Sequence, residues 1–352
     1  MSDPTPLDIA TRHQVLLEGL KSGVVADIRR SLGSTGESVG LILGAVDAVS
    51  LRDMPRASVD ALAADLGAAV SAGAAPIVDA VLATSGEVAA DTAGYEAQLV
   101  QSVAVGRNIV VPPAAQVAAA IEAAPLFSGA LLDPFVRDWQ ANAADAVARE
   151  VYAGYARGDT LADLKRAIRG TRAARYQDGL VQGVTARQAE AIARTSIQHA
   201  ASVGRMELYK ANPGTIKRYR WLSTLDGRTS AICRSLSGRV FDVGSGPQPP
   251  AHINCRSQII PEVAGSDRIR KITQQASMDG PVSADLNYYD WLKTQPGAYQ
   301  DDVIGPKRGA LLRNGGLSSD EFAKLQLGRD FRPLTLDEMR AKMPSAFTRA
   351  GI

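Results

Sequence analysis

The sequence is poor in cysteine, with two in 352 residues, and poor in aromatic residues, which make up 5% of it. Two cysteines are too few for the disulfide framework of a small secreted domain. No run of about 18 apolar residues occurs, so we expect no spanning helix and no membrane contact. The first residues lack the charged start and apolar block of a secretory signal. Neither a Gly-x-Gly-x-x-Gly pattern nor a phosphate-binding loop motif occurs, which argues against nucleotide binding.

Alanine supplies much of the 45% hydrophobic content, and this favours helices in close contact. An apolar residue at every fourth position predicts a first helix that ends at residues 33–36. The apolar positions of this helix are Leu16, Leu20, Val24, Ile28 and Leu32. A second helix-rich region covers residues 58–101, and we expect breaks near Gly73 and Pro76.

Helix-start signals continue in the middle of the chain. Asp133-Pro134 begins a predicted helix, since proline suits the first helical position, and Thr160 is placed to cap the next helix. Thr185-x-x-Gln188 has the spacing of a capping box. We expect it to open the best-defined helix, residues 186–211, which Pro213-Gly214 ends.

The C-terminal part carries signals for several short helices. Residues 288–292 read as one, and Ser318-x-x-Glu321 and Thr335-x-x-Glu338 are predicted capping boxes for two more. We expect these elements to lie on another surface without a core of their own.

Charge is distributed unevenly along the chain. The net charge is +2 overall, but it is −9 over residues 1–156 and +10 over residues 157–256. A basic middle beside an acidic start can meet a polyanion, an acidic protein or the chain's own N-terminal part.

The basic middle contains arginines at every third position, which would drift around one side of a helix. An exposed or paired arginine is the ordinary reading, and contact with phosphates, independent of base sequence, is the functional one. The aromatic residues expected for single-strand binding are sparse. The candidate nucleic-acid-binding residues are Arg166, Arg169, Arg172, Arg175, Lys217 and Arg218, with the last two expected close to the others.

The chain is organised around residues 216–262, because both cysteines and one of the three histidines lie there. A strand is predicted to open this stretch at Ile216. A short amphipathic segment carries Cys233, a turn at Gly238 leads into a second strand, and residues 258–260 form the closing strand. Trp221 and Phe241 are expected in its core.

Cys233, His252 and Cys255 have the residue types of metal ligands, and we expect them to converge in space. The last two are three residues apart, close to the short spacing of zinc knuckles. A fourth ligand is not evident, and the candidates are Asp226, Asp242 and a water molecule.

Three interpretations of these residues stay open. They hold zinc, or they are ordinary buried thiols beside a hydrogen-bonded histidine, or Cys233 and Cys255 form a disulfide. The disulfide would be unusual for a protein made in the cytoplasm.

A nucleophilic pair is the enzymatic alternative. His252 would activate Cys255 or Cys233, and Asp226 or Asn254 would orient the imidazole ring. Cleavage of a peptide or isopeptide bond would be the reaction. Only the residue types support this reading, so we expect no enzyme.

Several unusual residues follow one another in a distinctive order. A tryptophan precedes Asp-x-Arg-Thr, a cysteine, Leu-x-Gly-x-Val-Phe and Pro-Pro-x-His-x-x-Cys-Arg. The residues taken as the structural signature are Trp221, Asp226, Gly238, Phe241, Pro250 and Arg256. The succession resembles the signature of the Mu F-like head morphogenesis proteins, minor capsid proteins of tailed phages. Ala193-Arg194-Thr195 is similar to an element that precedes it. The chain departs at Ser257, where the family commonly has a second cysteine.

The resemblance implies a minor capsid protein that acts in procapsid assembly at the portal vertex. It implies portal protein and capsid protein as partners, phage DNA as a further contact, and a place in the virion head after synthesis in the host cytoplasm. A sequence-independent DNA-binding protein and a Cys/His-dependent hydrolase or protease of the virion are the rivals.

The expected fold is mainly α with a small α+β unit. A long, acidic N-terminal helical region would cover residues 1–156. Basic helices and the compact signature domain would cover residues 157–262, and an extended C-terminal tail residues 263–352.

Overall fold

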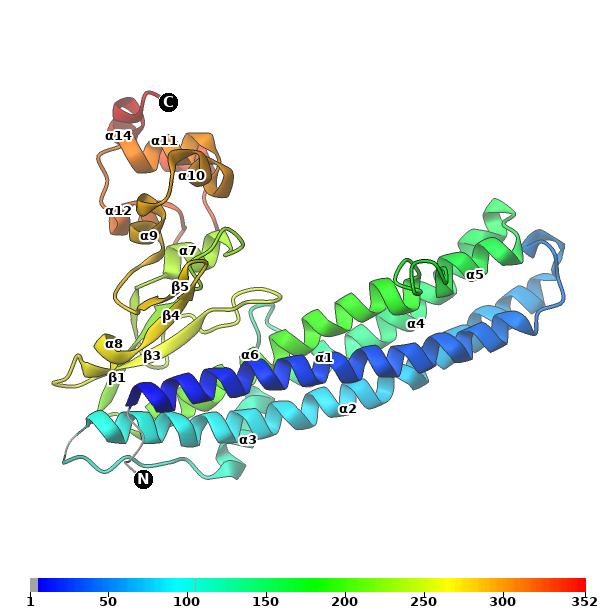
Figure 1. Cartoon of the computed structure of the whole chain (residues 1–352), viewed down its shortest axis with the longest axis horizontal. Helices are drawn as coiled ribbons and strands as arrows, with labels where there is room; N and C mark the ends of the chain where they lie inside the picture. Colours follow the sequence, from blue (N-terminus) through cyan, green and yellow to red (C-terminus); the bar gives the residue numbers. More distant parts are fainter. Residues whose placement is uncertain (1–5, 105) are drawn as a thin grey trace.

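The computed structural model describes residues 6–104 and 106–352. They form a long helical arm, a body at one end of it, and a C-terminal region that rises from the body (Figure 1). The body holds a three-stranded sheet, and the C-terminal region consists mostly of short helices. The predicted fold class, mainly α with a small sheet-containing unit, is confirmed.

The arm is built from antiparallel helices. α1 (Pro6–Gly44) runs from the body to the free end, and α2 (Arg56–Val103) runs back after a 3-10 turn at Leu51–Asp53. The short α3 (Ala114–Ala123) packs against α2 near the body. α4 (Leu132–Arg157) leads to the free end again.

The chain returns from the free end through α5 (Leu161–Arg169) and a π-helical turn at Leu180–Thr185. α6 (Ala186–Ala211) follows and ends in the body. Two apolar clusters fill the arm, one near its free end and one along its middle. Val39, Leu66, Val147 and Leu164 belong to the first, and Ile28, Val78, Val136 and Ile197 to the second.

The predicted end of the first helix at residues 33–36 is wrong, because α1 continues to Gly44. Gly36 serves close packing rather than termination. Gly36 lies so close to the Gln182 side chain that an added Cβ would overlap it. Tertiary contact therefore outweighs the low helix propensity of glycine.

The predicted breaks near Gly73 and Pro76 are also wrong, since α2 passes through both residues. Pro76 cannot donate a backbone hydrogen bond, and proline inside a helix costs about 3 kcal/mol relative to alanine. Ser31 of α1 donates its hydroxyl to the Gly73 carbonyl at 3.0 Å. Packing of α2 along α1, α4 and α6 offsets the cost.

By length and composition, α2 could cross a membrane, with a mean hydropathy of 1.7 over its most apolar 18 residues. The expectation of no such helix fails by this measure. The core helix of a soluble protein has the same composition, and α2 packs against α1, α4 and α6.

The structure confirms three of the helix caps that the sequence predicts and contradicts one. The predicted boxes at Ser318 and Thr335 are confirmed, and Thr160 caps α5 as expected. The predicted box at Thr185 is wrong, because that residue is itself helical and its side chain caps nothing. The π-helical turn Leu180–Thr185 leads directly into α6, so no free helix end remains at Thr185 for a side chain to cap.

The sheet of the body follows the strands predicted from the sequence. β1 (Ile216–Leu222) lies between β2 (Val240–Asp242) and β3 (Gln258–Val263), antiparallel to both. α7 (Ala231–Leu236) packs between the strands and the C-terminal region. Trp221 is fully buried, whereas Phe241 is half-buried, so the expected burial holds completely only for the tryptophan.

α6 joins the arm to the body. Every residue from 195 to 209 is buried, and Gly204 meets the Ala89 carbonyl of α2 so closely that a Cβ would overlap it. The burial includes charge: Glu96 of α2 accepts a hydrogen bond from the Tyr209 hydroxyl at 2.7 Å and lies 3.4 Å from Arg205. Burial raises the pKa of Glu96, so these two partners are what make a charged form tolerable there.

The C-terminal region begins with α8 (Arg268–Ile272) and a hairpin of β4 (Gln274–Ser277) and β5 (Gly280–Ser283), which the sequence did not indicate. Six short helices follow. They are α9 (Tyr288–Thr294), α10 (Gly297–Ile304), α11 (Pro306–Asn314), α12 (Ser319–Leu325), α13 (Leu336–Lys342) and α14 (Pro344–Ala350).

The C-terminal helices have a core of their own, contrary to expectation. Tyr288, Trp291, Phe322 and Phe347 are buried together, and Leu225 is the only body residue among the buried members of this cluster in the described chain. Aromatic residues contribute large buried areas, so a few short helices suffice to close a core. The division at residues 156 and 262 stays a prediction, although α5 and α6 pack with α1 and α2 across its first boundary.

We expect Trp221→Ala to lower the free energy of unfolding by about 3–5 kcal/mol, because it empties a fully buried site. Phe241→Ala, on the neighbouring strand, should cost less because that side chain is half-buried. Denaturant unfolding of both variants measures the difference. Equal losses, or an unchanged midpoint for Trp221→Ala, would contradict the packing of the sheet.

Candidate metal centre

Two separate segments bring Cys233, His252 and Cys255 together. Cys233 lies on α7, whose first turn is capped by Ser230, and the Ser230 hydroxyl accepts from the Cys233 backbone at 3.3 Å. The other two residues lie on the loop between β2 and β3, shortly after the buried Pro249 and Pro250. The predicted convergence of the three side chains is therefore present.

The three potential ligand atoms form a compact triangle. Cys233 Sγ lies 3.3 Å from His252 Nε2 and 3.7 Å from Cys255 Sγ, and all three atoms lie within 4.8 Å of one another. Both cysteines are buried and free, so the disulfide interpretation does not describe this structure.

The triangle fits one face of a tetrahedral metal site. With Zn–S of about 2.3 Å and Zn–N of about 2.0–2.1 Å, tetrahedral geometry puts two sulfurs about 3.8 Å apart and a sulfur and a nitrogen about 3.5 Å apart. The observed 3.7 and 3.3 Å are close to these values. Two sides of the triangle therefore have about the length that a tetrahedral site requires, and the third is at most 4.8 Å.

The ring of His252 is already oriented for this role. Its Nδ1–H donates to the Ile253 carbonyl at 2.8 Å, which leaves the Nε2 lone pair toward the cysteines. Metal-binding histidines are commonly held in this way, by a carbonyl on the second ring nitrogen.

The protonation of the three groups is coupled. The Cys233 thiol hydrogen-bonds to the Cys255 sulfur, which raises the pKa of Cys233 and lowers that of Cys255. The same Cys255 sulfur raises the pKa of His252 through a hydrogen bond. Without a metal, the group is best described as one thiolate stabilised by a thiol and an imidazole.

A buried serine supports the cysteine from the sheet side. Ser223 donates its hydroxyl to the Cys233 carbonyl at 2.7 Å and accepts from Trp221 Nε1 at 3.0 Å. Its oxygen also lies 3.3 Å from the hydroxyl of Ser257. The signature tryptophan thus contributes a hydrogen bond to the support of this centre as well as apolar area to the core.

Residues on both sides of Cys255 are tied to the arm. The Asn254 backbone donates to Thr195 of α6 at 3.0 Å, and Gln198 of α6 donates to the Ser257 carbonyl at 2.7 Å. Lys21 of α1 in turn donates to Gln198 at 3.0 Å. The sequence signalled Thr195 through the Ala-Arg-Thr element, but nothing in it indicated Gln198 or Lys21.

Asp226 is a structural acceptor and not a free ligand. Arg256 binds both of its oxygens, at 2.7 and 2.8 Å, and Thr229 and the Arg228 backbone also donate to it, at 3.1 and 3.0 Å. The Arg256 contact is the chief interaction that lowers the pKa of Asp226, against the opposing effect of burial. Asp242, the other predicted carboxylate ligand, is exposed on β2 and does not belong to the metal-ligating group.

Of the other signature residues, Gly238 has a φ of +80°, which suits the turn into β2 and is unfavourable for residues with a side chain. Pro250 is buried in the loop that leads to His252. The signature therefore contains turn and packing residues besides the three potential ligands.

The six candidate nucleic-acid-binding residues do not form one surface. Arg166 and Arg169 lie on α5, whereas Arg172 and Arg175 lie in the turns that follow, so the expected single helix is wrong. Arg175 has a φ of +50°, outside helical geometry.

The remaining two candidates, Lys217 and Arg218, lie on β1 at the opposite end of α6 (Figure 1). A helix of 26 residues spans about 39 Å, so the expectation that they lie close to the arginines is also wrong.

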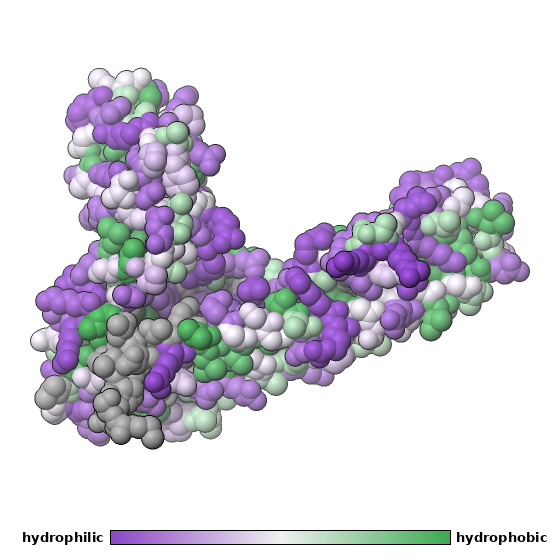
Figure 2. Space-filling view, viewed as in Figure 1, coloured by the Kyte–Doolittle hydropathy of each residue, from purple (hydrophilic) through white to green (hydrophobic). Residues whose placement is uncertain are grey.

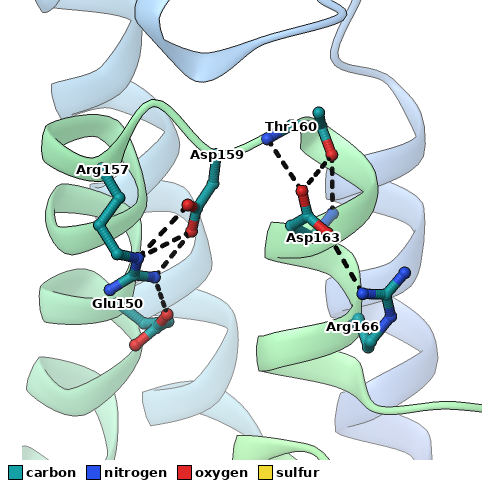
Figure 3. A network of polar contacts seen from close by, with 6 residues as sticks. All are labelled: Glu150, Arg157, Asp159, Thr160, Asp163 and Arg166. Carbon is teal, nitrogen blue, oxygen red and sulfur yellow. Dashed lines mark hydrogen bonds and ion pairs between the residues drawn. The ribbon is translucent and has the colours of Figure 1, made fainter.

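Two of the arginines are already engaged near the free end of the arm. Figure 3 shows Arg166 against Asp163, at 3.2 Å, beside a second group in which Arg157 contacts Glu150 and Asp159. Arg169 stacks over the Tyr176 ring at 4.6 Å. Within residues 6–104 and 106–352, no ion pair involves Arg172 or Arg175, and both are exposed.

We expect Arg256→Lys to lower the free energy of unfolding by about 1 kcal/mol, because lysine cannot donate to both oxygens of Asp226. Arg228→Lys is the matched control, since Arg228 lies 3.7 Å from the same carboxylate and is 85% exposed. It should change stability by less than about 0.5 kcal/mol. Thermal unfolding measures both, and equal effects would show that the paired contact carries no extra stability.

Comparison with known proteins finds one family that part of the chain matches. Residues 145–260 match the family model described as Phage Mu protein F like protein. The match runs from α4 through α6 and the metal centre to β3. No curated protein and no solved structure matches the chain. The resemblance found in the signature is confirmed over this segment, which is similar to the Mu F-like phage head morphogenesis proteins.

Proposed function

We propose that this protein is a minor component of the phage head that acts by binding during procapsid assembly, at the portal vertex. The observation that carries the proposal is the family match over residues 145–260. The matched segment contains the second half of α4, all of α5 and α6, most of the three-stranded sheet and the metal centre. A function common to the family therefore belongs to this whole unit and not to one loop.

The free end of the arm is where we place the contact with another head protein. Leu41 and Val49 are 77% and 84% exposed, and Figure 2 shows hydrophobic residues gathered on the visible face of this end. Exposed apolar groups in one area are typical of interaction sites. Beside them is a groove of about 660 Å³, lined by Ile42, Val46, Met54 and Leu62 among others.

The rim of this groove defines the chemistry of the partner. Asp47, Asp53 and Asp65 line it, and none of them takes part in an ion pair among the described residues. The surface thus fits a head protein that presents apolar side chains flanked by lysine or arginine. The portal protein and the capsid protein are the two candidates that the family suggests.

The test is co-expression with the portal and capsid proteins of the same phage, followed by affinity purification. We expect Leu41→Asp combined with Val49→Asp to reduce the recovered partner at least about tenfold, because both changes place charge in an apolar contact. Val15→Asp is the control, since Val15 is 67% exposed near the opposite end of α1. Undiminished recovery with the double variant would remove the free end from the assembly contact.

We further propose that the metal centre holds zinc in a structural role. Two cysteines and one histidine suit zinc, and the loop that carries two of them has little regular structure to hold it otherwise. The loop positions Arg256 and Asn254, which contact Asp226 and Thr195. Zinc would therefore hold the body together and against α6.

We expect about one zinc per chain in protein purified without added metal. Cys233→Ser and His252→Ala should each lose the metal and lower the melting temperature, and Ser245→Ala, on an exposed loop, should do neither. Inductively coupled plasma mass spectrometry and thermal unfolding give the two readouts. Wild-type protein without zinc, and with no uptake on addition, would leave only the interpretation as buried thiols.

The pH dependence of the affinity provides a further check. Binding must displace a proton from Cys233 and, below the raised pKa of His252, a second one from the imidazole. The logarithm of the affinity should therefore rise by about two per pH unit between the pKa of Cys255, about 4, and that of His252, and by about one per pH unit above the latter.

Contact with packaged DNA remains a second candidate, favoured only by Arg172 and Arg175 on the turns after α5. The wide separation from Lys217 and Arg218 argues for at most a local contact. Hydrolysis by a Cys/His pair is not proposed, because the pocket beside Cys233 and His252 has a volume of only about 20 Å³.

A further inference from the structure

Zinc is almost always four-coordinate in structural sites, and three protein ligands with a water otherwise occur in catalytic sites. The metal centre provides three protein ligands, beside a pocket of about 20 Å³ that is too small for a substrate. We propose that the fourth ligand is a water molecule, held in the small pocket beside Cys233 and His252. This inference rests on the zinc site proposed above and goes beyond it by assigning the open coordination position.

The pocket has the size and lining for one water molecule. Its volume is about 20 Å³, and a buried water requires at least about 10–15 Å³ and two to four polar partners. Cys233 and His252 line it, and so do the hydroxyl-bearing residues Thr229, Ser230 and Ser257. A metal on the triangle of ligands would thus have a water-sized space next to two of its three ligands.

The nearby carboxylate is a poor competitor for this position. Asp226 already accepts hydrogen bonds from Arg256, Thr229 and the Arg228 backbone. Turning it toward the metal would break the paired contact with Arg256 and leave a guanidinium without its partner, which is costly in a partly buried site.

Charge balance leads to the same ligand. A divalent zinc ion with two thiolates and a neutral imidazole has no net charge, and a neutral water preserves this. A carboxylate would add a negative charge, and the two arginines that line the pocket, Arg228 and Arg256, already contact Asp226. Uncompensated charge in a buried site is unfavourable.

Ser257 marks the open position. Its side chain is buried, and its oxygen lies 3.3 Å from the hydroxyl of Ser223, which in turn holds the Cys233 carbonyl. From there the Ser257 hydroxyl can hydrogen-bond a metal-bound water. Because a thiol occupies nearly the same place as this hydroxyl, Ser257→Cys should replace the water with a third sulfur ligand.

The decisive experiment is zinc K-edge X-ray absorption on the full-length chain. We expect two sulfur ligands and two nitrogen or oxygen ligands in the wild type, and three sulfurs with one nitrogen in Ser257→Cys. The change is resolvable because Zn–S bonds of about 2.3 Å are longer than Zn–N and Zn–O bonds of about 2.0–2.2 Å. Ser257→Cys should also bind zinc at least about tenfold more tightly in a chelator competition.

Three further variants make the test discriminating. Ser245→Cys adds a thiol on an exposed loop and should leave the sulfur count at two. Ser257→Ala and Asp226→Asn should keep four ligands and bind zinc within about tenfold of the wild type, as expected of groups outside the coordination sphere.

The possible failures are distinct. Loss of a ligand in Asp226→Asn or Ser257→Ala would identify a protein side chain at the fourth position and overturn the water. A sulfur count of two in a folded Ser257→Cys would also overturn it while leaving zinc in place. Absence of zinc from the wild type would instead refute the metal site itself, and the water with it.

Discussion

Complete burial of α6 over residues 195–209 is the constraint on which the rest of the structure depends. The helix has α2 against one side and the loop of the metal centre against another, so it supports the arm and the body at once. A buried polar group on such a helix costs free energy unless it finds a hydrogen-bond partner, and four side chains of α6 find one in other elements. Tyr209 and Arg205 find theirs in Glu96, and Thr195 and Gln198 find theirs in the metal loop.

The sequence predicted best where the local signal and the tertiary contact agree. The three strands, the caps at Ser318 and Thr335 and the meeting of Cys233 with His252 and Cys255 were all predictable. In each case, turns or short spacings fix the geometry over a few residues. The support for the centre was less predictable, because partners such as Gln198 lie far away in the chain and carry no recognisable motif.

Prediction failed where long-range packing overrules a local preference. α1 continues past Gly36 and α2 past Pro76 because packing against neighbouring helices stabilises the longer helix. No local sequence pattern indicates which helices these neighbours are. The basic residues failed differently. A regular spacing suggested one helical face, but Arg172 and Arg175 follow the end of α5, and α6 carries the chain away from them before β1 begins. Spacing in sequence is informative only within one element.

The contact between Gly204 and the Ala89 carbonyl has a mechanical consequence. Ala89 lies 33 residues from Arg56, where α2 starts at the free end, and this corresponds to a lever of about 50 Å. A tilt of about 5° at this crossing would move the free end by about 4 Å, which is comparable to the width of a side-chain contact. The reach of the arm is thus set at its root, and a single methyl group added at Gly204 could change which surface the far end meets.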